Sequence, residues 1–325
     1  MGQKKTEEIV IKKSGFVALI GRSNVGKSTL LNTLVGTKIA ATSFRPQMTR
    51  HIIHGVMNMP TGQATFVDTP GILKLKKSRL SAKLQHKVED ILNDVDVLIY
   101  VVDPSRDIGQ EERGIFGMIR HLDIPKILVI NKSDLPREER TYSEAYEQWA
   151  KEFDAVFSLS ALRASHIQPL KEKVMEFLPE GEPFYLDEQL TNIDNRFWIA
   201  ELIREKVFSV FEKEVPYSIT VEVDNVEEKM VPKAVAAGSD DPNRTTAQKK
   251  AASKERAAAP KEEMIVIQAR ILTDLERFKK IIIGHAGNKI KEIGVMSRRE
   301  LEAALNRRVF LELEVEVDPH WVERI

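Results

Sequence analysis

Residues 21–28 place two glycines, a lysine and a serine at the spacing of a phosphate-binding loop, between an apolar run and a helical pattern. Glycines let the backbone wrap closely around an anion, and the amides of the loop and the following helix N-terminus direct partial positive charge at it. We expect Lys27 to contact the β- and γ-phosphates of a nucleotide and the Ser28 hydroxyl to coordinate Mg²⁺. The nucleotide-binding candidates here are Gly21, Arg22, Ser23, Asn24, Val25, Gly26, Lys27, Ser28 and Thr29.

Three further motifs each follow a short apolar run. Asp68-Thr69-Pro70-Gly71 offers a carboxylate that can hold Mg²⁺ through water and a glycine amide that can reach the γ-phosphate. Taken alone, this motif is more often only a turn. Asn131-Lys132-Ser133-Asp134 and then Ser160-Ala161 follow the next two runs.

The motif at 131–134 matches the N-K-x-D motif of guanine-specific GTPases. The Asp134 carboxylate can accept from the guanine N1–H and 2-amino groups, and Ser160-Ala161 resembles the motif whose alanine amide meets guanine O6. Adenine has no such donors at that edge, so it would leave the carboxylate unpaired, which is costly. Four motifs in this order therefore predict a guanine-nucleotide site, which also includes Asp68, Asn131, Lys132 and Ser160.

The elements that position these motifs alternate between apolar strands and amphipathic helices. We expect strands at 16–20, 65–67, 95–102, 127–130 and 156–160, with helices at 26–35, 80–92 and 111–122 and another ending near residue 178. This alternation predicts an α/β domain with a doubly wound, mostly parallel sheet, in which ligands bind beyond the carboxyl ends of the strands.

The pattern changes after residues 179–183, which are rich in Pro, Gly and Glu and indicate a linker. A long helix is expected at 196–212, strands at 218–226, 264–272 and 309–317, and two helices flanking Gly284-His285-Ala286-Gly287. Residues 233–261 have no large apolar residue after Val235, which predicts disorder. They hold seven basic and three acidic residues, consistent with a solvated spacer or a non-specific phosphate tether.

Composition sets wider limits. The 325 residues suffice for two domains, and 49 basic residues balance 49 acidic ones, so a nucleic-acid surface must be a local basic patch. The absence of cysteine excludes disulfides and thiolate chemistry. No stretch approaches the ~20 apolar residues of a membrane span, and no secretion signal is evident, so we expect a cytoplasmic protein.

Together these motifs resemble the Era GTPases. Gln47-Met48-Thr49-Arg50 is similar to their first switch, and residues 197–218, 281–287 and 290–294 are similar to their RNA-binding domain. The resemblance runs from about residue 15 to 321 and implies a P-loop GTPase domain (1–179), a linker (180–195) and a type II KH domain of α+β class (196–325) with an insert at 233–261. It further implies binding near the 3′ end of 16S ribosomal RNA, a GTP-controlled role in 30S subunit assembly, and slow intrinsic GTP hydrolysis.

Some roles follow from this resemblance alone. Thr49 is assigned to Mg²⁺ and the γ-phosphate beside Ser28 and Asp68, although Met48 replaces a family threonine, and Lys27, Thr49 and Gly71 are the catalytic candidates. Ile72 stands where Ras-type enzymes carry a water-positioning glutamine, which fits slow turnover. Asn24 either coordinates K⁺, as in related GTPases, or simply caps the turn.

The RNA-binding candidates surround the G-x-x-G loop. KH domains clamp about four nucleotides against such a loop, and nearby cations hold the phosphates. Here His285-Ala286 replaces the usual lysine-glycine, and residues 281–283 are expected to back the groove. The candidates are Lys279, Lys280, Ile283, Gly284, His285, Ala286, Gly287, Asn288, Lys289, Lys291 and Arg298.

Other functions remain open from the residues alone. The second half could instead serve another step of translation or RNA processing, or bring the helix at 196–212 to the inner surface of the cell membrane as a peripheral contact. Without the upstream match, the G-x-x-G segment could equally be a plain helix-turn-helix. We expect a monomer with GTP or GDP and Mg²⁺ as ligands.

Overall fold

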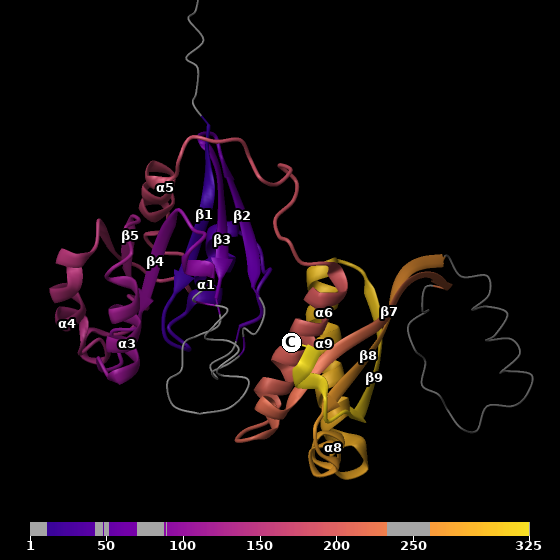
Figure 1. Cartoon of the computed structure of the whole chain (residues 1–325). Coiled ribbons are helices and arrows are strands. Elements are labelled where there is room, and N and C mark those ends of the chain that lie inside the picture. The colour runs from indigo at the N-terminus through magenta and orange to yellow at the C-terminus, as the bar shows by residue number, and fades with distance from the viewer. Residues whose placement is uncertain are drawn as a thin grey trace, which may run out of the picture. The chain divides into compact units, whose positions relative to one another are not determined.

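The computed structural model describes residues 12–42, 48, 52–69, 88, 90–232 and 261–324. The chain divides into two compact units, with the boundary between Asp194 and Asn195. Each unit has its own sheet (Figure 1), and among the described residues the first sheet has six strands and the second has three. The predicted insert at 233–261 lies outside the described residues except for Lys261, where a strand begins.

The sheet of the first unit is mostly parallel, as predicted. Its strands are β1 (Lys13–Ile20), β2 (Ile53–Met59), β3 (Gly62–Asp68), β4 (Val97–Val102), β5 (Lys126–Ile130) and β6 (Ala155–Ser158). They lie in the order β2-β3-β1-β4-β5-β6, and β2 alone is antiparallel to its neighbour. The carboxyl ends of β1, β3, β4, β5 and β6 therefore meet at one edge, where all four motifs follow a strand.

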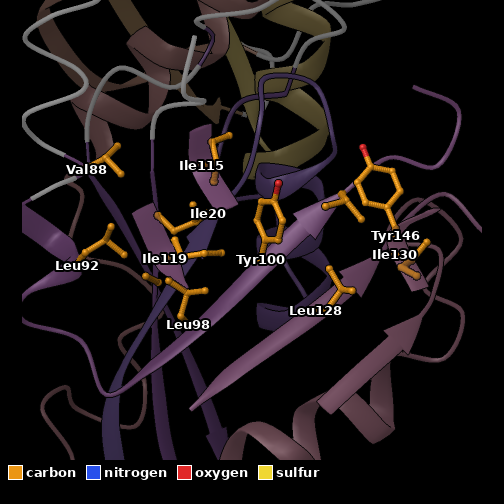
Figure 2. Close-up of a cluster of buried hydrophobic side chains, with 12 residues drawn as sticks. Ile20, Val88, Leu92, Leu98, Tyr100, Ile115, Ile119, Leu128, Ile130 and Tyr146 are labelled. Carbon is orange, nitrogen blue, oxygen red and sulfur yellow. The ribbon is translucent and has the colours of Figure 1, made fainter. Parts of the chain in front are cut away.

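Helices cover both faces of this sheet. Helices α1 (Lys27–Val35) and α5 (Ile167–Phe177) contact each other and strands β1 and β3, so they share one face. Helices α3 (Gln110–Ile119) and α4 (Ser143–Glu147) pack on the other face. Figure 2 shows the apolar cluster on that side, in which Ile115 and Ile119 of α3 meet Tyr100 of β4 and Leu128 of β5. Because helices cover both faces of the parallel strands, every residue of β4 is buried.

The segment predicted as a linker belongs mainly to the first unit. Residues 184–192 lie along the edge strand β2, where Thr191 bridges Gly55 and the Val56 amide donates to the Leu190 carbonyl at 2.9 Å. The His54 ring nitrogen Nδ1 lies 2.7 Å from the Tyr185 hydroxyl. This segment covers hydrogen-bonding groups that an edge strand would otherwise expose.

The second unit is an α+β domain. It contains α6 (Asn195–Val210), β7 (Ile219–Pro232), β8 (Lys261–Thr273), α8 (Glu276–Ile283), α9 (Asn288–Leu305) and β9 (Arg308–Val317). Strand β8 is central, antiparallel to β7 and parallel to β9. Along β9, Val309 and Val315 are buried while Glu312 and Glu314 are exposed, so the helices cover one face and the other faces solvent.

Helix α6, the candidate membrane contact, uses its apolar residues in this core. Leu202, Ile203 and Phe208 are almost fully buried, and the Arg204 guanidinium pairs with Glu201 inside the domain. No helix among the described residues has both the length and the apolar character to cross a bilayer.

Candidate functional site

The phosphate loop sits between β1 and α1 at the carboxyl edge of the sheet. Gly26 adopts φ 101°, a left-handed conformation that favours glycine, and a Cβ there would lie 2.3 Å from the Asn131 side-chain amide nitrogen. A Cβ on Gly21 would meet the Val101 carbonyl oxygen at 2.3 Å. The two glycines are therefore required by close contacts as well as by conformation.

Lys27 is held inside the loop. Its Nζ donates to the carbonyls of Gly21 and Arg22 at 3.0 and 3.1 Å, and the residue is only 6% exposed. Burial lowers the pKa of Lys27 from its usual 10.5 to about 8, although Asp68 and Glu112 oppose this shift. A negative charge bound next to this ammonium would stabilise its protonated form and raise its pKa.

Ser28 and Asp68 meet at the other side of the loop. The Ser28 hydroxyl donates to Asp68 Oδ2 at 2.6 Å, and Asp68 is fully buried at the end of β3. Thr69 donates from Oγ1 to the Leu19 carbonyl at 2.7 Å and so fixes the start of this motif. Thr29 is the third residue of α1, and its carbonyl accepts from the Thr33 hydroxyl. Thr49 and Gly71 lie outside the described residues.

The base motif is joined directly to the phosphate loop. Asn131 is buried; its Nδ2 donates to the Val25 carbonyl at 2.8 Å and its Oδ1 accepts from the Ala161 amide at 2.9 Å. The Ser160 hydroxyl donates to Asp134 Oδ1 at 2.5 Å, and Asp134 itself is exposed. These bonds hold the Asp134 carboxylate and the Ala161 amide next to each other while leaving the carboxylate accessible to a ligand.

Several acidic and tyrosine residues behind the loop were not predicted, although their partner Arg22 was. The Arg22 guanidinium forms an ion pair with Glu111 at the start of α3. Glu112 is 1% exposed, accepts from the Tyr146 hydroxyl at 3.3 Å, and lies 3.5 Å from that of Tyr100. In Figure 2 both tyrosine hydroxyls point out of the apolar cluster in the same direction.

The buried acidic residues behind the loop each have a basic partner. Burial raises the pKa of Glu112, and the Arg22 guanidinium opposes the rise. Lys132, in the base motif, pairs with Asp103, which is buried directly after β4. The signal for Asp103 was present in the sequence, since it follows a predicted strand as the motif residues do.

In the second unit, a tight loop joins α8 to α9. Gly284 and Gly287 have φ of 73° and 75°, and a Cβ on Gly284 would lie 2.7 Å from Lys289 Cγ. Ala286 is forced to φ 52°, a conformation that costs a non-glycine residue about 1 kcal/mol. His285 and Ala286 are exposed, and Asn288 begins α9.

A groove lies beside this loop, between α9 and β9. It has a volume of about 290 Å³, an apolar floor and two basic residues at its edges. Its lining residues are Ile290, Lys291, Gly294, Val295, Arg298, Leu311 and Leu313. Of these, sequence reasoning named only Lys291 and Arg298 as RNA-binding candidates. The apolar members could have been suspected from the spacing of residues 290, 294 and 298, which share one helix face.

Other predicted residues occupy different places. Ile282 is fully buried in the core and Ile281 is 47% exposed, and residues 281–283, which were expected to back the groove, are not among its lining residues. Lys280 is exposed on α8, Lys279 and Ile283 are half-buried, and the Lys289 ammonium pairs with Glu292 at 2.8 Å.

Comparisons with known proteins agree with this architecture. Residues 16–132 match a family model described as a 50S ribosome-binding GTPase, and residues 246–322 match one described as a KH domain. The chain is 39% identical over 311 residues to the GTPase Era of Caldanaerobacter subterraneus subsp. tengcongensis, covering 95% of this chain and 94% of that protein. It is 36% identical over 312 residues to the GTPase Era of Halothermothrix orenii, covering 96% and 95%.

Two solved structures align over 96% of each chain, both with a TM-score of 0.78 and 34% identity. One is Era in complex with MgGDPNP and nucleotides 1506–1542 of 16S ribosomal RNA, and the other is an Aquifex aeolicus Era variant bound to GDP.AlF4-. Fold and site thus define a P-loop GTPase with a C-terminal KH domain. The chain belongs to the GTPase Era family, and the recognition made from its motifs is confirmed.

Proposed function

We propose that this chain is a GTP-controlled switch that binds 16S ribosomal RNA near its 3′ end and acts in assembly of the 30S subunit in the cytoplasm. One observation carries the proposal: a guanine-nucleotide site and a basic-edged KH groove occur in one chain that aligns along 96% of its length with an Era structure holding MgGDPNP and 16S RNA. That structure is 34% identical to this chain.

At the nucleotide site, we assign the base to the exposed Asp134 carboxylate and to the Ala161 amide, whose N–H donates to Asn131 Oδ1 in this structure and would be shared with guanine O6. Asn131 and Ser160 position these two groups through the bonds described above. The amides of residues 22–28 and the Lys27 ammonium receive the phosphates. This division separates base recognition at β5 and β6 from phosphate recognition at β1.

Mg²⁺ fits the oxygen donors at the loop. Ser28 and Asp68 present a hydroxyl and a buried carboxylate 2.6 Å apart, the hard ligands that this ion prefers. Thr49 is the third proposed ligand. When bound, the ion neutralises charge on the β- and γ-phosphates.

Hydrolysis then depends on positioning and charge neutralisation. Lys27 stabilises negative charge at the γ-phosphate, and we assign Thr49 and the Gly71 amide to the same group. Ile72 has no polar atom in its side chain and does not orient a water molecule, so we propose slow turnover without an activator.

K⁺ is a further proposed cofactor, held by Asn24. The left-handed conformation of Asn24, with φ 67°, fits its alternative role as a turn residue equally well. Equal hydrolysis rates in KCl and NaCl would remove the K⁺ role and leave the turn role.

RNA binding is assigned to the groove and its loop. The close approach of backbone at Gly284 and Gly287 suits a phosphate chain, while the apolar floor suits bases. Lys291 and Arg298 lie at the groove itself, and Lys279 and Lys280 extend the basic surface along α8.

Two alternatives to this proposal concern the ribosomal subunit that the protein serves and a contact with the membrane. The family model that matches the GTPase domain is described as 50S ribosome-binding. Its match ends at residue 132 and so does not include the groove to which we assign RNA selection. A membrane contact through α6 is disfavoured because its apolar side chains are in the core. We propose a monomer, because most apolar residues of both sheets are buried and only single ones such as Val156, Met230 and Phe310 are exposed among the described strand residues.

A filter-binding assay with a 16S 3′-end RNA and a scrambled RNA of equal length tests the proposal. We expect the 3′-end RNA to bind at least about tenfold more tightly, and Gly294→Leu to abolish the difference by filling the groove. A Cβ at Gly294 meets open space, so the fold should tolerate the change. Gly117→Leu on α3, also in open space, is the matched control and should bind as wild type. Equal affinity for both RNAs would refute the assignment.

A further inference from the structure

Arg106 contacts the phosphate loop from outside every motif. It follows the turn after β4, in which Asp103 Oδ1 accepts from the amide and the hydroxyl of Ser105 at 3.0 and 2.7 Å. From this turn, Arg106 Nη1 donates to the carbonyl oxygen of Ser23, in the middle of the loop, at 2.8 Å. Because β4 lies beside β1 in the sheet, the two segments meet although 83 residues separate them.

This contact fixes the direction of a peptide group. In a planar trans peptide, the C=O of one residue and the N–H of the next point in opposite directions. A donor that holds the Ser23 carbonyl on the outer side therefore turns the Asn24 amide toward the opposite, inner side of the loop. An anion in the loop needs its amides on that inner side.

Two other side chains also hold carbonyls of the loop, although Lys27 does so from within it. Lys27 Nζ holds the carbonyls of Gly21 and Arg22, and Asn131 Nδ2 holds that of Val25 at 2.8 Å. Lys27 and Asn131 belong to recognised motifs, whereas Arg106 is the third member of the set and belongs to none. Because the Arg106 donor is charged, its hydrogen bond is stronger than one between neutral groups.

We propose that Arg106 is a positioning residue that holds the Ser23–Asn24 peptide in the orientation that binds the nucleotide phosphates. The inference rests on the proposed assignment of the phosphates to this loop. A second observation supports it: Ser23 is 5% exposed, and its hydroxyl has no hydrogen-bond partner within the part of the chain that the structure describes. A buried hydroxyl of this kind is the expected state of a group whose partner is a ligand.

A merely structural role for Arg106 makes a different prediction. The turn that carries it also carries Asp103, which pairs with Lys132 of the base motif. If Arg106 served only to hold the turn, its loss would disturb base recognition together with phosphate binding. If it orients one loop peptide, phosphate affinity should fall while the preference among bases stays constant.

The experiment measures GDP, GTP and IDP affinities of the full chain by displacement of a fluorescent GDP. IDP lacks the 2-amino group, so the GDP-to-IDP ratio reports on Asp134. We expect Arg106→Ala to weaken GDP and GTP about 10- to 100-fold, the effect of one charged hydrogen bond, with the ratio unchanged. Arg106→Lys, which keeps a charged donor, should recover part of the loss.

Two variants make the result interpretable. Arg113→Ala removes an exposed arginine from α3 and should bind GDP as wild type does. Lys27→Ala tests the loop assignment itself, because Lys27 would contact the phosphates directly. The role of Arg106 would be overturned if Arg106→Ala lost no more affinity than Arg113→Ala does. It would also be overturned if Arg106→Ala changed the GDP-to-IDP ratio. Wild-type affinity in Lys27→Ala would instead overturn the phosphate assignment on which it rests.

Discussion

GDP binding should take up a proton at mildly alkaline pH. Lys27 is buried and has a pKa of about 8 in the free protein. A bound diphosphate supplies negative charge next to the ammonium and raises the pKa in the complex. The complex therefore holds more protons than the free protein above neutral pH, and affinity must fall as pH rises.

The magnitude follows from this pKa of about 8. At pH 8, half of the free protein carries a neutral Lys27, so each GDP bound should take up about 0.5 proton. The uptake should be about 0.1 at pH 7 and about 0.9 at pH 9. The dissociation constant should accordingly rise about twofold from pH 7 to pH 8, and about fivefold more by pH 9. The terminal phosphate is already ionised at pH 8 and adds little, since its pKa is about 6.

Titration calorimetry of GDP at pH 8, in several buffers of different ionisation enthalpy, gives the proton uptake as a slope. Lys27→Arg keeps its charge over this range and should show a slope near zero. A slope near zero in the wild type would refute the depressed pKa. An equal slope in the arginine variant would assign the proton to another group.

Three further changes have distinct expected outcomes. Gly26→Ala should reduce GDP affinity at least about 100-fold in a fluorescence titration, because its Cβ would meet Asn131 at 2.3 Å; near-wild-type binding would contradict the loop geometry. Ser160→Ala removes the bond that orients Asp134 and should lower the preference for GDP over ADP about fivefold in a competition assay, and an unchanged preference would refute that role. Ala286→Gly should stabilise the second unit by on the order of 1 kcal/mol in calorimetric unfolding of the full chain, because φ 52° suits glycine, whereas destabilisation would contradict the strain.

The nucleotide site was largely predictable because its motifs follow strands. Parallel strands bring their carboxyl ends to one edge, so Lys27, Asp68 and Asn131 had to lie near one another once the alternation was recognised. The central strands were also clear from their apolar runs, since burial on both faces leaves few polar positions. Which ligand atoms these residues contact stays a prediction.

Other features depend on contacts that no local pattern encodes. Strand β2 is an edge strand with mixed residues, and residues 184–192, which lie within the predicted linker 180–195, pair with it. Arg106 reaches Ser23 through the sheet order rather than through spacing in the sequence. Thr49 and Gly71 lie outside the described residues, so their roles stay predictions.

The groove in the second unit shows the same limit. Charged residues near the G-x-x-G loop could be named from the sequence, but the floor combines α9 with Leu311 and Leu313 of β9. Residues 281–283 seemed suitable because they are apolar and adjacent to the loop. Helical geometry instead places Ile282 in the core and Ile281 at the surface.

The most direct test is the affinity of one 16S 3′-end RNA for the full chain loaded with a GTP analogue and then with GDP, measured by fluorescence anisotropy. We expect tight, sequence-dependent binding with the analogue and at least about fivefold weaker binding with GDP, a coupling of about 1 kcal/mol between the two sites. Identical RNA affinities in both nucleotide states would contradict a GTP-controlled switch.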